Sequence, residues 1–383
     1  MDTSVYDYAI IGAGAAGLHL CLAMSEDPYF RSKKILILEK HVEKPINPTW
    51  CFWEKGEGKW DDLVDASWRK TAYITSQKAI EIALGSYTYK MVHGIDFFTK
   101  SRQQLRQKEN ITWIDSEVNT IEVGNPVKII TPDSTYLASH VFDSRIDPDF
   151  FQEKGKFTYL KQHFEGWVIE SDQEIFDPEV FTMMDYRLIY PGTTSFIYIL
   201  PVSRTKGLVE YTFFSPDLVD QSVYETYLKK YISEILNIEN YQVVKKESSV
   251  IPMTDYPFHK MNNQHVTKIG TAGGWVKGSS GYSFKNAERK SQQIIDNIKK
   301  NKQPGHNLTK WRFRIYDMLF LDVLGSHNEI GPFLFDDMYY KNDIELILSF
   351  LDEETTFWQE LRIMNTFNKW LFMKAIFKRL LGL

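Results

Sequence analysis

Three glycines near the amino end have the spacing of a dinucleotide-binding loop. Residues 12–17 read Gly-Ala-Gly-Ala-Ala-Gly, between an apolar strand pattern at 5–11 and a helical stretch that starts at residue 18. In such a loop the first glycine permits a tight turn, the second lets the main chain approach a pyrophosphate, and the third lets the helix pack closely on the strand. The residues expected to bind the cofactor here are Gly12, Gly14, Ala15, Ala16 and Gly17.

An acidic residue follows at the position where a ribose would lie. The second strand pattern, residues 34–38, ends in Glu39, about 20 residues past the loop, where a carboxylate accepts hydrogen bonds from ribose hydroxyls. Its charge would repel a 2′-phosphate, which disfavours NADP and leaves FAD or NAD. The alternative is a glycine turn in an ordinary β-α unit with Glu39 merely solvated.

A second glycine-rich segment lies far along the chain. Residues 270–274 read Gly-Thr-Ala-Gly-Gly after a strand pattern at 266–269, and a long polar helix is expected from about 282 to 300. Main-chain amides and a helix amino end would face the pyrimidine edge of a flavin or the pyrophosphate; the alternative is a plain glycine-rich turn. The candidate cofactor residues are Gly270, Thr271, Ala272 and Gly273, with Asp143 at the end of a predicted parallel strand.

Composition restricts the function classes. The 383 residues include 45 Lys and Arg and 50 Asp and Glu, so the net charge is -5. A chain without excess positive charge is not expected to bind nucleic acid. The two cysteines, Cys21 and Cys51, form no zinc or disulfide pattern, and the histidines show no ligand spacing, so we expect no metal site. We find no signal-peptide pattern and no apolar run of about 18 residues, which favours a cytoplasmic protein.

The order of the patterns predicts an α/β fold with a discontinuous nucleotide domain. We expect a glutathione-reductase-like, Rossmann-type FAD-binding domain from residues 1–75, 95–147 and 255–302. Residues 76–94 and 148–254 would form an inserted antiparallel β-sheet domain for substrate, and residues 303–383 a helical carboxyl-terminal region. No second GxGxxG unit for a nicotinamide nucleotide occurs. This arrangement is more typical of a flavoprotein than of a dehydrogenase.

The motifs resemble those of the lycopene β-cyclase family over most of the chain. Beyond the glycine loop, six matches occur in the family's order. They are Asn47-Pro48-Thr49-Trp50-Cys51-Phe52, Phe142-Asp143-Ser144-Arg145, Phe176-Asp177-Pro178 with Met184-Asp185-Tyr186-Arg187, the pair Phe196–Pro201 and Leu208–Thr212, Val250-Ile251-Pro252-Met253, and Gly270–Gly273 with Ser280-Gly281-Tyr282.

The resemblance implies an acid-catalysed ring closure with no net redox change. Lycopene would be cyclised through γ-carotene to β-carotene, with FAD required in its reduced form and electrons from NAD(P)H supplied externally. The family's catalytic glutamate corresponds to Glu210. Plant members carry two adjacent glutamates there, whereas Tyr211 follows here, and Ser144 stands where the family often has Ala. A copy of the plant pattern, with Glu353 and Glu354, lies outside the strand context, and we assign the role to Glu210.

The residues around Glu210 suit a proton donor. Strand alternation places Leu208 and Phe214 on the same face, where they would desolvate the carboxyl, raise its pKa and keep it protonated. A glutamate at a solvated strand edge is the alternative. Aromatic faces stabilise cations, so the substrate residues expected are Trp50, Phe52, Trp53 and Tyr282; core packing is the alternative for the tryptophans.

The last twenty residues, 364–383, are rich in apolar and basic side chains and contain no acid. A basic amphipathic helix would hold an enzyme with a lipid-soluble substrate at the inner face of the cell membrane as a peripheral protein. Lys369 and Lys374 fall near the apolar side, however, so a helix packed on the body is an equal alternative.

Two other functions fit the same motifs. One is a flavin-dependent oxidoreductase acting on an isoprenoid or aromatic substrate, in which FAD turns over electrons. The other is a carotenoid-binding or scaffold protein that keeps FAD as a structural element.

Overall fold

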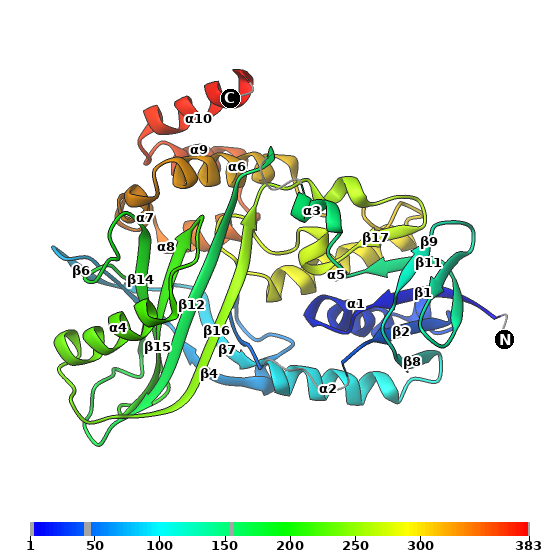
Figure 1. Ribbon diagram of the computed structural model, residues 1–383, viewed down its shortest axis with the longest axis horizontal. Coiled ribbons are helices and arrows are strands. Elements are labelled where there is room, and N and C mark those ends of the chain that lie inside the picture. Colours follow the sequence, from blue (N-terminus) through cyan, green and yellow to red (C-terminus); the bar gives the residue numbers. More distant parts are fainter. Residues whose placement is uncertain (1–3, 42–46, 153–155, 382–383) are drawn as a thin grey trace.

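A computed structural model describes residues 4–41, 47–152, 156–381 (Figure 1). The first sheet is built around β1 (Val5–Ile11), whose last three residues are buried. Its neighbours are parallel: β2 (Ile35–Glu39) on one side and β11 (Thr135–Asp143) on the other. The remaining parallel strands are β8 (Ile111–Asp115) and β17 (Val266–Lys268). Two antiparallel strands complete the sheet: β10 (Val127–Ile130) pairs with β11, and β9 (Thr120–Glu122) pairs with β10 at the edge.

Helices cover the glycine-loop face of this sheet. Helix α1 (Ala15–Glu26) follows β1 directly and packs against α5 (Phe284–Lys299), although the two are far apart in sequence. Helix α2 (Gly94–Arg106) also contacts α1. A strand, a tight turn and a helix returning over a parallel sheet form the Rossmann arrangement. The predicted Rossmann-type fold is therefore confirmed.

The second sheet has seven strands and is antiparallel except for one pair. Its strand β15 (Lys206–Ser215) lies between β12 (Tyr159–Glu170) and β14 (Thr194–Pro201), and nine of its ten residues are buried. The outer strands are β16 (Gln242–Thr254), β13 (Val180–Asp185), β5 (Lys70–Ile74) and β6 (Ala79–Ala83). Helix α4 (Gln221–Lys230) covers one face, with contacts to β12 and β15.

A small third sheet links the two larger ones. It consists of β3 (Thr49–Lys55), β7 (Tyr87–His93) and β4 (Val64–Trp68), with β7 in the centre. Strand β3 carries the aromatic segment of the sequence. The side chains of Phe52 and Trp53 on β3 point into two different hydrophobic cores, since successive residues of a strand face opposite sides.

The carboxyl-terminal region is helical, as predicted. It contains α6 (Trp311–Ser326), α7 (Gly331–Lys341), α8 (Ile344–Leu351), α9 (Phe357–Met364) and α10 (Lys369–Leu381). In Figure 1 these helices lie above the second sheet, with α10 outermost. Helix α6 contacts β12 and β16, and α10 rests on α6. The second sheet is thus covered by α4 on one face and by this helical layer on the other.

One predicted boundary is wrong. Residues 70–74, placed with the nucleotide domain as part of 1–75, form β5, which pairs in parallel with β13 of the second sheet. The hydrogen-bonding partner is more than 100 residues away in sequence, which a local pattern cannot show. The α/β class with a Rossmann-type domain, a largely antiparallel sheet and a helical end is otherwise confirmed.

Candidate active site

The turn from β1 into α1 has the geometry that its glycines predict. Gly12 adopts a φ of +92°, and a Cβ on Gly17 would lie 2.1 Å from the carbonyl oxygen of Gly12. A Cβ on Gly14 would meet nothing within 4 Å. Gly17 is therefore required by helix–strand packing, whereas Gly14 borders open space at the amino end of α1, where a pyrophosphate fits.

Glu39 is hydrogen-bonded to the glycine loop. Its side chain is 3% exposed, and its Oε2 accepts a 2.6 Å hydrogen bond from the amide of Ala13 while Oε1 accepts one of 2.9 Å from the amide of His41. A carboxylate has about four acceptor positions, so ribose hydroxyls can still be accommodated. The residue thus has a structural role in addition to the ribose contact that we predict for it.

The second glycine segment lies beside the first. The short helical turn Gly270–Gly273 follows β17, and a Cβ on Gly270 would come within 3.1 Å of the Cβ of Ala16 on α1. Gly270 also has a φ of +62°, which favours glycine. The two glycine motifs therefore meet at the start of α1, as a single cofactor site requires. Ala272 is buried in this turn, and Thr271 faces a large cavity described below.

Asp143 lies at the end of β11, next to Ile11 of β1. Its carboxylate receives hydrogen bonds from the Arg145 guanidinium at 2.9 and 3.1 Å and from Lys268 Nζ at 3.0 Å. Burial alone would raise the pKa of Asp143, but these two cations outweigh it and hold the pKa below its usual value. The carboxylate is thus engaged by protein groups, and its predicted cofactor contact is not visible in this arrangement.

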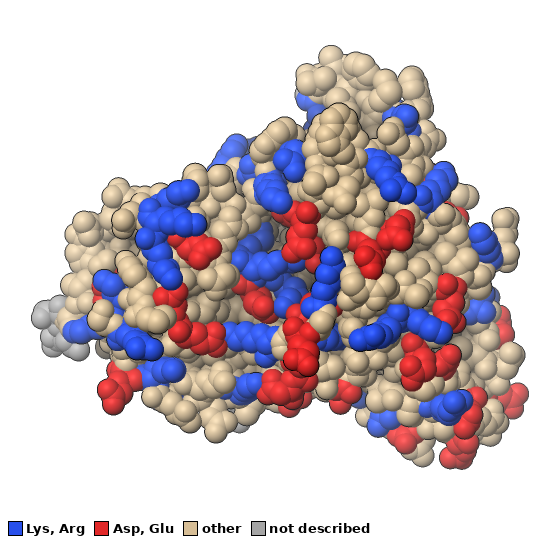
Figure 2. Space-filling view, turned by 180° about the vertical axis from the view of Figure 1, so that it is seen from behind, with Lys and Arg blue, Asp and Glu red and all other residues tan. Residues whose placement is uncertain are grey.

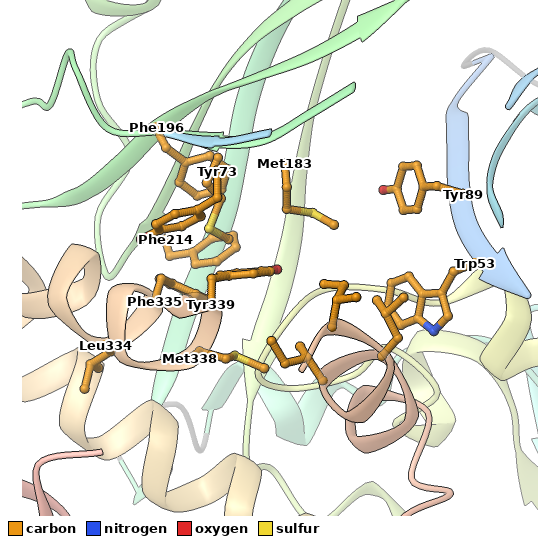
Figure 3. Close-up of a cluster of buried hydrophobic side chains, with 14 of the residues drawn as sticks. Trp53, Tyr73, Tyr89, Met183, Phe196, Phe214, Leu334, Phe335, Met338 and Tyr339 are labelled. Carbon is orange, nitrogen blue, oxygen red and sulfur yellow. The ribbon is translucent and has the colours of Figure 1, made fainter. Parts of the chain in front are cut away.

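A single large cavity of about 1090 Å³ connects the nucleotide domain to the carboxyl-terminal helices. At one end it is lined by Thr49 and Thr271, and at the other by Phe367 and Ile376 near and on α10. Its wall is largely apolar. Figure 3 shows part of this wall, where Phe196 and Phe214 of the second sheet face Phe335, Met338 and Tyr339 of α7. A long cavity of this kind fits an elongated, apolar ligand.

Not all predicted aromatic residues border the cavity. Trp50 and Tyr282 line it. Phe52 and Trp53 are 2% and 4% exposed, and neither lines it: Phe52 stacks on Phe284, and Trp53 packs edge-on against Tyr282. The expectation of direct substrate contact therefore fits the position of Trp50 and Tyr282 but not that of the other two, whose side chains are used in core packing.

Three tyrosine hydroxyls form a chain on the cavity wall, which the sequence did not indicate. The Tyr89 hydroxyl is 2.8 Å from that of Tyr198 and 2.9 Å from that of Tyr282. Burial raises the pKa of each of these phenols, so all three stay neutral at physiological pH. One of them, Tyr198, lies directly opposite Glu210 on β14.

Glu210 is a buried carboxyl in the cavity wall. It is 7% exposed, and its face of β15 also carries Leu208, Thr212 and Phe214, all of which line the cavity as the alternation predicts. Burial, followed by the charge of Glu247, raises its pKa from 4.5 to about 8, although a hydrogen bond from Thr212 opposes the shift. The carboxyl is therefore largely protonated at neutral pH and can donate a proton.

The other candidate acids occupy different surroundings. Glu353 lies just after α8 with a φ of +62°, and its carboxylate is 3.5 Å from Lys277. Glu354 is 3.6 Å from Arg289. Neither lines the cavity. Both are ion-paired connectors between helices, which favours Glu210 for the catalytic role.

Two further polar residues of the cavity were not predicted to belong to the site: Glu247 on β16 and Thr49 at the start of β3. The hydroxyl of Thr49 donates a 2.7 Å hydrogen bond to Glu247 Oε2. The two are 198 positions apart, so no local signal could pair them. Within the described residues, no three His, Cys, Asp or Glu side chains gather as a metal site would require.

The fold and the site together define a flavoprotein-type enzyme architecture: a Rossmann dinucleotide fold with an inserted sheet that carries a buried acid in an apolar cavity. The family comparison gives the particular assignment. The model of the family described as lycopene cyclase protein matches residues 7–379, nearly the whole chain. The chain belongs to this family. A search of curated proteins returns no match.

Solved structures share the fold at low sequence identity. A geranylgeranyl bacteriochlorophyll reductase-like protein from Thermoplasma acidophilum has a TM-score of 0.59 at 12% identity, with 97% of this chain and 96% of that chain covered. The flavin-dependent brominase Bmp2 has a TM-score of 0.58 at 13% identity, with 91% and 93% covered. A flavoprotein/dehydrogenase from Cytophaga hutchinsonii has a TM-score of 0.57 at 11% identity, with 91% and 92% covered.

Proposed function

We propose that this protein is a lycopene β-cyclase that closes the ends of the linear carotenoid to β-rings with Glu210 as the proton donor. The observation that carries the proposal is the protonated carboxyl of Glu210 in the wall of a long apolar cavity that begins at the nucleotide domain. The family membership of the chain agrees with it. FAD is the dinucleotide proposed for the two glycine motifs, in its reduced form, with electrons from NAD(P)H supplied externally.

The reaction is balanced without an oxidant. A proton from Glu210 adds to the terminal double bond, and the tertiary cation that forms is captured by the next double bond to close the ring. A proton then passes from the ring to water or to the Glu210 carboxylate and restores a double bond, so the product is an isomer of the substrate and no proton is consumed overall. Reduced FAD, when bound, supplies negative charge beside the cation.

Residues of this chain contribute the dry surroundings that such a cation needs. The lining of the cavity is mostly apolar, so few competing nucleophiles reach the site. Trp50 and Tyr282 offer aromatic faces, each worth about 0.5–2 kcal/mol in a cation–π contact. A carboxyl with a pKa near 8 is a weak acid, so stabilisation of the cation, not acid strength, must lower the barrier.

We further propose that the substrate enters from a membrane surface at the α10 end of the cavity. Phe372, Met373 and Ile376 of α10 line the cavity, while Trp370, Phe377 and Leu380 on the same helix are 71%, 58% and 75% exposed. In Figure 2 the projection at the top, which α10 forms, shows basic but no acidic side chains. Such a surface fits anionic lipid. No described helix combines the length and apolarity needed to cross a bilayer.

The test uses the purified full-length protein with lycopene in liposomes and chemically reduced FAD under anaerobic conditions. We expect β-carotene to form, with γ-carotene as the intermediate, and the flavin to stay reduced. The Glu210→Gln variant should bind FAD but form no product. Absence of cyclised product from the wild-type protein with the flavin reduced would overturn the proposal.

The same assay separates the two alternatives. An oxidoreductase acting on an isoprenoid or aromatic substrate would consume NADPH or oxygen in proportion to product. A carotenoid-binding or scaffold protein would take up lycopene equally well in the wild-type protein and in Glu210→Gln, with no product from either. Cyclisation without net oxidation of the flavin is the result that only the proposed function gives.

A further inference from the structure

A row of residues crosses the cavity face of the second sheet at the level of Glu210. Glu210 on β15 pairs with Gly166 on β12, and Gly166 pairs with Glu247 on β16. Directly opposed residues of antiparallel strands point to the same face, and both glutamates line the cavity. Their main chains are two strand spacings apart, about 10 Å. Two carboxyl groups therefore lie on one largely apolar wall, and the strand between them carries no side chain at this level.

Gly166 adds no side chain between the two glutamates, where only Leu208 Cδ1 reaches over it among the nearest atoms. A Cβ at this position would lie 3.4 Å from the Cβ of Glu210, 3.4 Å from the Cγ of Glu247 and 2.8 Å from Leu208 Cδ1. Any larger residue would shield the two carboxyl groups from each other or displace them. Gly166 and Glu210 are buried, and the side chain of Glu247 is 13% exposed although β16 is the edge strand of the sheet. Charges in such partly buried surroundings interact more strongly than they would in water.

The carboxyl of Glu247 is held by two donors. Its Oε2 accepts hydrogen bonds from Thr49 Oγ1 at 2.7 Å and from Lys245 Nζ at 3.2 Å. Both donors bind the same oxygen. Lys245 is 34% exposed at its side chain, so solvent screens much of its charge. Lys245 thus only partly offsets the effect of Glu247, which raises the pKa of Glu210.

The other titratable groups around Glu210 are neutral phenols and a thiol, or are ion-paired. Burial raises the pKa of the Cys51 thiol to about 12 and that of Tyr89, Tyr198 and Tyr282 well above physiological pH. Across the cavity, Asp317 on α6 is already paired with Lys277 at 2.9 Å. Lys246 of the same sheet also lines the cavity, but its Nζ is 3.3 Å from Glu225. Glu247 and its partner Lys245 are therefore the charged pair on this sheet that we take to act on Glu210.

We infer that Glu247 is a positioning residue that forms a carboxyl pair with Glu210 across Gly166 and so keeps Glu210 in its proton-donating form. The inference rests on the proposed cyclisation for its purpose, but it concerns the protonation state of Glu210, which can be measured without turnover. Burial makes the largest contribution to the raised pKa of Glu210, and the charge of Glu247 makes the next largest.

The experiment records the carboxylic C=O infrared band of Glu210 as a function of pH in the full-length, FAD-loaded protein. The band is assigned by its loss in Glu210→Gln. In Glu247→Gln, which keeps an acceptor for Thr49, we expect the titration midpoint to fall by about one pH unit. In Lys245→Gln the midpoint should rise, because the charge of Glu247 is then less neutralised. Glu170→Gln, at the exposed end of β12, is the matched control and should leave it unchanged.

The basic limb of the cyclisation pH profile should move in the same direction as the infrared midpoint in each variant. Midpoints that stay at the wild-type value in both Glu247→Gln and Lys245→Gln would overturn the inference. If the midpoints move as expected but the wild-type protein forms no cyclic product, the carboxyl pair stands and the proposed function fails. If product forms and neither variant moves the midpoint, only the role of Glu247 fails.

Discussion

The hydroxyl of Thr212 donates a 2.6 Å hydrogen bond to Oε1 of Glu210, two residues earlier on the same face of β15. A hydrogen bond of this kind is stronger to the ionised carboxylate than to the neutral acid, so it favours loss of the proton. Burial and the charge of Glu247 act in the opposite direction and prevail, leaving the pKa near 8. Thr212 therefore moderates the acid and also fixes the direction in which the carboxyl points.

Removal of this hydrogen bond should make Glu210 harder to ionise. In Thr212→Val the pKa of Glu210 should rise by about 0.5–1 unit, because the ionised form loses a donor. The basic limb of the cyclisation pH profile should then shift upward. The measurement is kcat/KM between pH 6 and 9.5 in the liposome assay. A downward shift would show that the hydroxyl instead stabilises the protonated acid.

Glu210 should also make the stability of the protein depend on pH. Its pKa is about 8 in the folded state against an ordinary 4.5, so the folded state holds the proton more tightly than the unfolded chain. The free energy of unfolding should therefore fall as pH rises from about 4.5 to 8. Glu210→Gln is neutral throughout. Relative to wild type it should gain on the order of 2–3 kcal/mol between pH 5 and pH 7.

The matched control for this prediction is Glu170→Gln, which removes a carboxylate of the neighbouring strand that is about half exposed. Urea unfolding at several pH values measures the difference between each variant and the wild-type protein. The stability of Glu170→Gln relative to wild type should not vary appreciably across this range. A difference for Glu210→Gln that stays constant with pH would mean that Glu210 has an ordinary pKa.

The parts of the site that the sequence predicts are those set by local spacing. The loop of residues 12–17 can be recognised from the sequence alone, because the tight turn and the close helix contact need glycine at fixed offsets from β1. The burial of Glu210 follows from strand alternation with Leu208 and Phe214. Both inferences use only neighbours within a few positions, and both hold in the structure.

The rest of the site depends on pairing between distant segments. Glu247 comes near Glu210 only because β16 pairs with β12 and β12 with β15, and a shift of one residue would turn it to the other face. The aromatic run of β3 shows the same limit. The composition of the run suggests one binding surface, but alternation places Phe52 and Trp53 in two separate cores, and which face borders the cavity depends on long-range packing.

The glycine loop permits a test that separates folding from cofactor binding. Gly14→Ala places a methyl group in open space, so thermal stability without cofactor should change little. FAD affinity should fall at least about tenfold, because the methyl group obstructs the approach of the pyrophosphate. In Gly17→Ala the methyl group would meet the Gly12 carbonyl oxygen at 2.1 Å, and the protein should lose about 1–3 kcal/mol of stability.

Flavin fluorescence and thermal unfolding distinguish the two variants, and each serves as the control for the other. Gly14→Ala should retain the melting temperature of the cofactor-free protein and lose affinity, whereas Gly17→Ala should lose both. Unchanged FAD affinity in a folded Gly14→Ala protein would show that the dinucleotide does not pass over this residue.

The exposed side of α10 provides a test of membrane docking that leaves the cavity intact. Deletion of residues 364–383 is less informative, because Phe372 and Ile376 line the cavity and Arg379 ties the helix to Asp255 and Asp322 at 2.6 and 2.7 Å. Point substitutions on the outer side avoid both effects.

A triple variant with Trp370→Ser, Phe377→Ser and Leu380→Ser should bind anionic vesicles at least about a hundredfold more weakly, since each exposed apolar side chain contributes on the order of 1–2 kcal/mol on insertion. Its melting temperature should match that of wild type, because these side chains are already in water.

Leu218→Ser, which replaces an apolar residue that is 53% exposed and precedes α4, is the matched control and should bind vesicles as wild type does. Equal vesicle binding by the triple variant and wild type would show that α10 does not touch lipid. Cyclisation of lycopene delivered in detergent should survive the triple substitution even where vesicle binding is lost, since the inner side of α10 that faces the cavity is unchanged.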